Sequence, residues 1–265
     1  MRKGFTLVEL SIVLVIIGLL IGGILIAQSM IETAKIEMLI RQIQQIDAAV
    51  ANFKTRYNYL PGDAPSDMGG PVAGTGWQGY GNGNGTLDDG SQDTDPYITP
   101  GYEHYGFWVQ LQNGTDFNPP KFTNNGDVHF SDPEAVFGKS SGGGKTLIET
   151  YTLPVSHYNN YYAICAPTGV QWISANQRFP VFTPNQALAI DAKIDDGLTG
   201  FPDQTTYTGS ILAVPPSSLA LSGPFSQPSS GCVSQSDNTK YNTTSSATEC
   251  CLMIAIQASS GGTGN

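Results

Sequence analysis

Residues 5–27 read FTLVELSIVLVIIGLLIGGILIA, an almost unbroken apolar run of 23 residues. As an α-helix with a rise of about 1.5 Å per residue, this run is roughly 34 Å long, enough to cross a hydrocarbon layer of about 30 Å. A secretory signal peptide would need a shorter apolar region and a small-x-small cleavage site, and Ala27-Gln28-Ser29 is a poor site of that kind. The run therefore predicts a membrane-spanning helix.

Glu9 is the only charged residue in this run. An acidic side chain inside hydrocarbon costs on the order of a few kcal/mol unless a partner neutralises it. The next Lys or Arg along the chain is Lys35. We therefore expect the cation that neutralises Glu9 to come from outside this helix.

The residues before and around Glu9 resemble the processing motif of type IV prepilins and type II secretion pseudopilins. The matching stretch is Lys3-Gly4-Phe5-Thr6-Leu7-Val8-Glu9. The resemblance implies that a prepilin peptidase removes a leader of residues 1–4, cutting after Gly4, and methylates the new N-terminus at Phe5. It also implies that Glu9 pairs with the Phe5 ammonium of a neighbouring subunit. The alternative for this stretch is an uncleaved signal anchor.

The apolar pattern becomes periodic after Gln28. Apolar residues then recur at intervals of three and four, which is one stripe along a helix: Ile36, Leu39, Ile40, Ile43, Ile46, Val50, Phe53 and Tyr57. Residues 28–57 are therefore predicted to continue the helix of residues 5–27 as an amphipathic stalk whose stripe packs on a sheet. Pro61 cannot continue a helix, so the helix should end just before it.

Residues 58–265 are predicted to form the exported α+β globular domain. Runs typical of short strands occur at 146–153, 161–166, 187–194, 210–214 and 252–256. Residues 105–111 fit either a strand or a short helical turn. The predicted fold class is thus α+β and pilin-like, with one long N-terminal helix packed on a mostly antiparallel sheet with long loops.

Charge is divided unevenly along the chain, whose formal net charge is −10. The residues after Arg56 contain eighteen acidic and six basic side chains, a net charge of −12. This acidity argues against a nucleic-acid partner. Arg2 and Lys3 precede the predicted span and favour a cytoplasmic N-terminus, which places the acidic domain in the periplasm.

Four cysteines, Cys165, Cys232, Cys250 and Cys251, all follow the stalk. In an oxidising compartment they are expected to form disulfides. A bond between the adjacent Cys250 and Cys251 would be strained, so Cys165 and Cys232 should each take one of these two. The sequence leaves open which takes which, and buried thiols remain the alternative.

A glycine-rich stretch after the stalk is a candidate calcium loop. Asn82, Asn84, Asp88 and Asp89 place oxygen-bearing side chains around a glycine turn, as a calcium loop requires. On EF-hand spacing, however, Tyr80 and Ser91 fall where the anchoring carboxylates belong. A plain Asn/Gly turn is the alternative, and no cofactor is expected to be required.

Residues 189–195 alternate as a strand would, with Ala189, Asp191, Lys193 and Asp195 on one face. The following Asp196-Gly197 favours a turn. The alternation and this turn signal predict a half-buried strand followed by a hairpin turn. The stretch also resembles one in larger pilin-like proteins, which supports the family resemblance in the C-terminal part of the chain.

No set of residues predicts catalysis. Gly138-Lys139-Ser140-Ser141-Gly142 has the spacing of a nucleophile elbow, but no helix pattern follows it. Gly144-Lys145-Thr146 resembles the end of a phosphate loop without its first glycine. His104, His129 and His157 lack metal-ligand spacing.

Together with the absence of a catalytic pattern, the resemblance to type IV prepilins implies a non-enzymatic subunit of a type IV pilus or pilus-like filament. Its expected partners are other pilin or pseudopilin subunits, prepilin peptidase, an inner-membrane assembly platform and membrane lipid. It is expected in the bacterial inner membrane before assembly, and then in an extracellular pilus or a periplasmic pseudopilus. The first alternative is a type II secretion pseudopilin. The second is a membrane-anchored exported binding module or hydrolase that never polymerises.

Overall fold

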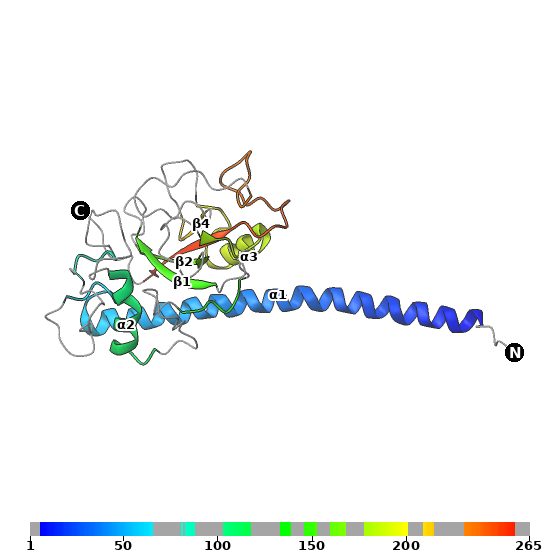
Figure 1. The fold of residues 1–265 in the computed structure, drawn as a ribbon, viewed down its shortest axis with the longest axis horizontal. Coiled ribbons are helices and arrows are strands. Elements are labelled where there is room, and N and C mark those ends of the chain that lie inside the picture. Colours follow the sequence, from blue (N-terminus) through cyan, green and yellow to red (C-terminus); the bar gives the residue numbers. More distant parts are fainter. Residues whose placement is uncertain are drawn as a thin grey trace.

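The computed structural model describes residues 6–65, 81, 83–87, 103–117, 133–138, 146–152, 160–167, 178–200, 209–214 and 231–257. These residues form a long helix and a smaller body of sheet and helices beside its C-terminal half (Figure 1). The predicted α+β fold class is confirmed. The elements in chain order are α1 (Leu7–Tyr57), α2 (Glu103–Gly114), β1 (Leu147–Thr152), β2 (Asn160–Pro167), β3 (Arg178–Phe179), α3 (Pro184–Ile194), β4 (Ile211–Val214) and β5 (Cys251–Ala255).

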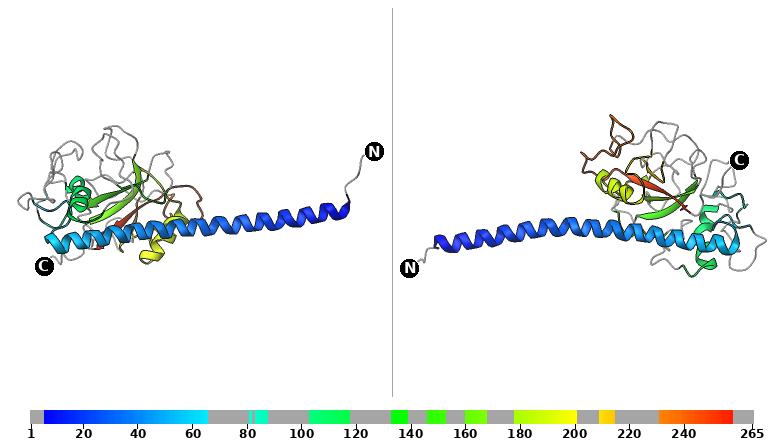
Figure 2. Two further views of the ribbon diagram at one scale, coloured as in Figure 1. Left: turned by 90° about the horizontal axis from the view of Figure 1, so that it is seen from below. Right: turned by 180° about the vertical axis from the view of Figure 1, so that it is seen from behind.

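Helix α1 has 51 residues and two different environments. Its N-terminal half projects away from the rest of the molecule in all three views, whereas its C-terminal half lies along the domain (Figures 1 and 2). The predicted apolar stripe is confirmed, because Ile36, Leu39, Ile43, Ile46, Val50 and Phe53 are buried, and Ile40 and Tyr57 pack against the same core while partly exposed.

Asn58 ends α1 three residues before Pro61. It adopts the left-handed conformation with φ 62°, and its backbone N–H donates to the Lys54 carbonyl at 2.8 Å. Asn tolerates this conformation better than other side-chain-bearing residues, so it serves as a stop signal.

The domain is built on an antiparallel sheet in the order β1-β2-β5-β4, and β3 pairs with the end of β2. Strands predicted at 146–153, 161–166, 210–214 and 252–256 correspond to β1, β2, β4 and β5. The ambiguous stretch at 105–111 lies within α2. Helix α2 lies near the C-terminal end of α1, and its Phe107, Trp108 and Leu111 are buried in the core.

The strand predicted at 187–194 is wrong, because these residues form helix α3. Thr183 and Gln186 form a capping box in which each side chain bonds the other's backbone N–H, and Pro184 occupies the first turn. These are strong helix-start signals. Asp191 and Lys193 therefore do not share a strand face: Asp191 is fully buried, whereas Lys193 is exposed.

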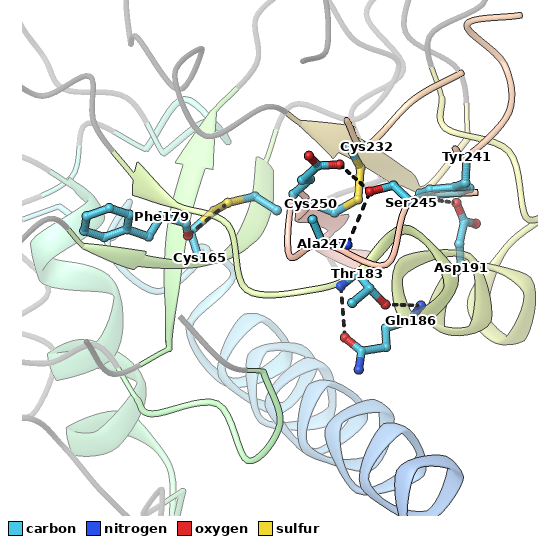
Figure 3. The surroundings of a disulfide bond; sticks show 12 residues. Cys165, Phe179, Thr183, Gln186, Asp191, Cys232, Tyr241, Ser245, Ala247 and Cys250 are labelled. Atoms are coloured by element: carbon cyan, nitrogen blue, oxygen red, sulfur yellow. Dashed lines mark hydrogen bonds between the residues drawn. A yellow bond between two sulfur atoms is a disulfide. The ribbon is translucent and has the colours of Figure 1, made fainter. Parts of the chain in front are cut away.

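Two disulfides join the C-terminal part of the domain (Figure 3). Cys165 of β2 is bonded to Cys251 of β5, and Cys232 is bonded to Cys250. The expectation that Cys165 and Cys232 each take one of the adjacent cysteines is confirmed. Because neighbouring residues of an extended strand point to opposite sides, Cys250 and Cys251 serve two separate bridges.

Candidate assembly site

The N-terminal end of α1 is capped by Thr6 together with Glu9, an acidic residue of the helix itself. Glu9 Oε2 accepts hydrogen bonds from the Thr6 backbone N–H and the Thr6 hydroxyl, both at 2.8 Å, and the Glu9 N–H donates to Thr6 Oγ1 at 3.3 Å. This capping box satisfies backbone groups that no helical carbonyl reaches. It gives the carboxylate donors but no cation. Gly4 and Phe5 lie outside the described residues.

The first half of α1 exposes its apolar side chains on every side. The large hydrophobic residues from Leu7 to Ile31 have exposed fractions between 46% at Ile17 and 85% at Leu7. By length and composition this helix can cross a membrane. Such a surface requires lipid or other helices around it, since water would leave the apolar area unburied.

The second half of α1 is fixed to the domain by partly buried polar contacts. The Gln42 amide donates to the Glu134 carbonyl and accepts from the Val136 N–H, both at 2.9 Å. Tyr162 of β2 donates its hydroxyl proton to Asp47 Oδ1 at 3.1 Å. Burial raises the pKa of the Asp47 carboxyl to about 6, although hydrogen bonds from Tyr162 and the Gln257 backbone lower it.

Helix α3 lies against the start of the stalk. Its Gln186 amide donates to Glu32, and its Lys193 ammonium lies 3.1 Å from a Glu37 carboxylate oxygen. Glu32 is five residues beyond the predicted span, which ends at Ala27. The domain thus begins a short distance along α1 from that span.

Residues 1–25 match the family model described as the prokaryotic N-terminal methylation motif. The chain has a prepilin-type N-terminus. The resemblance to type IV prepilins and pseudopilins is confirmed over these residues, and the apolar helix, the capped Glu9 and the two disulfides are consistent with it. No curated protein and no solved structure gives a significant match to the chain.

A second carboxyl–phenol pair in this prepilin-type chain joins α3 to the disulfide-closed segment of residues 232–250 (Figure 3). Tyr241 donates its hydroxyl proton to Asp191 Oδ2 at 2.6 Å, and the Gly197 N–H donates to Asp191 Oδ1 at 3.2 Å. Burial, with a smaller contribution from the nearby Asp195 and Asp196 carboxylates, raises the pKa of Asp191 to about 7, although the hydrogen bonds from Tyr241 and the Gly197 N–H lower it. The Asp191–Tyr241 pair therefore places a buried carboxyl group where α3 meets the disulfide-closed segment.

The described part of the candidate calcium loop is organised around Asp63. The backbone N–H groups of Gly83, Asn84 and Gly85 donate to the buried Asp63 carboxylate at 2.7 to 3.0 Å. Gly81 has no room for a side chain, because a Cβ there would lie 2.0 Å from the Asp63 backbone. Asp63 therefore anchors the loop, a role that its sequence position after the stalk did not suggest.

The calcium ligand set itself is mostly outside the described residues. Asn82, Asp88 and Asp89 lie there, and the Asn84 side-chain oxygen accepts hydrogen bonds from the Thr86 N–H and hydroxyl at 2.7 and 2.6 Å. The calcium site stays a prediction, and calorimetric titration of the chain with millimolar calcium would test it.

The enzyme-like motifs also fall largely outside the described residues. Ser140, His129 and His157 lie there, and α2 includes the backbone of His104.

The polar contacts that sequence reasoning missed are those of Gln42, of Asp63 and of the two carboxyl–phenol pairs. The spacings Thr6–Glu9 and Thr183–Gln186 carried a readable signal, since Ser/Thr followed three residues later by Glu or Gln marks a helix start.

Proposed function

We propose that the chain is a structural subunit of a type IV pilus or pilus-like filament, assembled through α1. The observation that carries the proposal is the contrast within this one helix. Residues 7–31 expose their apolar side chains on all sides, whereas buried contacts fix the second half of the helix to its own domain. A filament of parallel helices buries the exposed half without altering the domain.

The prepilin-type N-terminus supports a specific order of events. Prepilin peptidase cuts after Gly4 and methylates Phe5 while α1 lies in the inner membrane, with the domain in the periplasm. The subunit then leaves the membrane as its helix packs among those of other subunits, on an inner-membrane assembly platform. Function in this reading is mechanical and not catalytic.

Glu9 has two roles in the proposal. It caps α1 within the subunit through Thr6, and it pairs with the Phe5 ammonium of the neighbouring subunit. The two roles are compatible because an ionised carboxylate has two oxygens with about four acceptor positions. Glu9 Oε2 receives both bonds from Thr6, so Glu9 Oε1 can receive the ammonium.

The test is recovery of the full-length chain in sheared surface filaments, measured against its membrane pool. We expect Glu9→Ala to lower the filament-to-membrane ratio at least about tenfold, because an ammonium left unpaired in an apolar core costs a few kcal/mol. Thr6→Ala, which removes the cap but leaves the carboxylate, should reduce the ratio less. Normal recovery of Glu9→Ala in filaments would overturn the pairing role given to Glu9. Absence of the unaltered chain from filaments would contradict the proposed function and favour the non-polymerising alternative.

The N-terminal sequence and mass of the mature protein test the processing step. An N-methylated Phe5 is expected, whereas a chain that still begins at Met1 would overturn the proposal. A type II secretion pseudopilin has the same N-terminus, so gene neighbourhood and loss of secretion in a deletion strain separate it from a pilus subunit. The role of main or minor subunit follows from the abundance of the chain in purified filaments.

A further inference from the structure

The acidic side chains of the stalk are all engaged by the subunit's own domain. Residues 28–57 contain the carboxylates Glu32, Glu37 and Asp47. Their partners are Gln186 and Lys193 of α3 for the two glutamates, and Tyr162 of β2 for Asp47. Each carboxylate of the stalk therefore already has a partner within its own subunit.

Two cations of the stalk, in contrast, have no polar partner among the described residues. Lys35 and Arg41 are exposed, and neither makes a hydrogen bond or ion pair with the described residues. Arg41 follows Glu37 by one helical turn, a spacing that permits an ion pair, but the Glu37 carboxylate is bound to Lys193 instead. The other two cations differ, since Arg56 donates to the Gly114 carbonyl at 3.4 Å and Lys54 is also engaged.

These two cations belong to one exposed side of α1, which we call the cationic stripe and define as Ile31, Lys35, Met38, Arg41 and Gln45. The members recur at intervals of four, three, three and four residues, so they lie along one side of the helix. Ile31 and Met38 are 54% and 49% exposed. The stripe thus combines exposed apolar area with two cations that have no polar partner in the part of the chain that the structure describes, directly beyond the apolar span.

Lipid headgroups cannot satisfy the whole stripe. The headgroup layer extends roughly 5–8 Å beyond the hydrocarbon core. At about 1.5 Å per residue, Lys35 lies about 12 Å and Arg41 about 21 Å along α1 from Ala27. Arg41 is therefore well beyond the headgroups when residues 5–27 span the membrane upright.

A second copy of the chain has the complementary charge. The residues after Arg56 have a net charge of −12, and Asp116 and Asp196 are exposed carboxylates among those described. We propose that the cationic stripe docks on the acidic domain of a second copy, with Lys35 and Arg41 each forming an ion pair with one of its carboxylates. This inference rests on the proposed filament and adds the partner that the stalk takes within it.

The proposal is tested with paired variants of the full-length chain in its own membrane. Lys35→Gln with Arg41→Gln removes both charges and should lower the filament-to-membrane ratio about tenfold, because the lost contact recurs at every subunit. Lys35→Arg with Arg41→Lys keeps both charges and should assemble normally. The matched control is Lys240→Gln, which removes an exposed cation whose partner is the neighbouring Asp237.

A photo-crosslinking residue in place of Met38 identifies the partner directly. The expected product is a dimer in which residue 38 is joined to a peptide from residues 58–265 of a second copy. Crosslinks confined to lipid, to a different protein or to another stalk would overturn the inference. Protease resistance of the domain in each variant shows that folding is unchanged.

The two proposals fail in different ways. If the unaltered chain is absent from filaments, the proposed function fails and the inference fails with it. If the unaltered chain assembles and Glu9→Ala does not, but the doubly neutralised chain assembles as the control does, only the inference is overturned.

Discussion

At the scale of single residues, two carboxyls hold helices to the rest of the domain, the partly buried Asp47 and the fully buried Asp191. Asp47 attaches α1 to β2 through Tyr162, and Asp191 attaches α3 to the disulfide-closed segment through Tyr241. In both cases burial is the largest influence and raises the pKa, to about 6 for Asp47 and about 7 for Asp191. Burial disfavours the charged form, so both sites bind a proton more readily in the folded chain.

This shift predicts how stability depends on pH. Both folded-state pKa values lie above the unfolded value of about 4. Between about pH 4 and pH 7 the folded chain therefore binds more protons than the unfolded chain, and its stability falls as pH rises through this range. Between pH 5 and pH 8 we expect a loss on the order of 2–4 kcal/mol. Urea unfolding of the detergent-solubilised chain at pH 5, 6, 7 and 8 measures it.

The control for this prediction is Asp191→Asn. An amide oxygen still accepts the Tyr241 hydroxyl proton but does not titrate in this range. The variant should therefore lose stability less steeply between pH 6 and pH 8 than the unaltered chain. Equal slopes would show that Asp191 does not titrate in this window.

At the scale of elements, boundaries are set by local side-chain chemistry, and docking is set by a few buried polar groups. Capping boxes start α1 and α3, and an Asn in the left-handed conformation ends α1. Docking of α1 relies on the apolar stripe and also on Gln42, whose amide satisfies two backbone groups of the segment at residues 134–136. That segment pairs in turn with the residues at the start of β1.

Gln42→Leu should therefore destabilise the domain. The substitution leaves the Glu134 carbonyl and the Val136 N–H without their side-chain partner, which costs about 1–3 kcal/mol when the groups remain buried. Gln44→Leu is the matched control, because Gln44 is an exposed residue of the same helix and should change stability by less than about 0.5 kcal/mol. Denaturant midpoints of the two variants measure the difference, and similar midpoints would contradict the role given to Gln42.

At the scale of the whole molecule, the chain is a rod with a domain attached to one half. The contacts of α3 with Glu32 and Glu37 place α3 and the disulfide-closed segment toward the predicted membrane side, whereas α2 lies near the far end of α1 (Figures 1 and 2). One disulfide joins Cys251 of β5 to Cys165 of β2. The other joins Cys250, the residue before β5, to Cys232. They close the domain at the end of the chain.

Breaking each bridge should destabilise the domain, and the loss of stability should differ between the two bridges. The Cys232–Cys250 bridge has a sequence separation of 18 and the Cys165–Cys251 bridge one of 86. The chain-entropy model then gives about 3 kcal/mol for the first and about 4–5 kcal/mol for the second. Cys232→Ala with Cys250→Ala, compared with Cys165→Ala with Cys251→Ala, tests the order by urea unfolding.

Mass analysis provides the independent check on connectivity. Alkylation before reduction should modify no cysteine, and alkylation after reduction should modify four. A proteolytic peptide pair joining residue 165 to residue 250 would contradict the pairing described here.

Local pattern in the sequence determined the features that need no distant partner. The apolar run predicted a helix able to span a membrane, the three-and-four periodicity predicted the buried stripe of the stalk, and the motif around Glu9 predicted the prepilin-type N-terminus. Each signal lies within a few helical turns, so chain order alone reveals it. The Thr6–Glu9 cap belongs to the same class, because its two residues are three positions apart.

Tertiary structure decided whatever joins residues far apart in the chain. The alternation at residues 187–194 is compatible with a strand or a helix. The local Thr183–Gln186 cap favours a helix, and packing against α1 places α3 in the fold. The pairs Asp47–Tyr162 and Asp191–Tyr241 are 115 and 50 residues apart, and the Asp63 loop anchor spans about 20. Spacing cannot reveal such contacts, because a buried carboxylate is tolerated only where the fold brings donors to it.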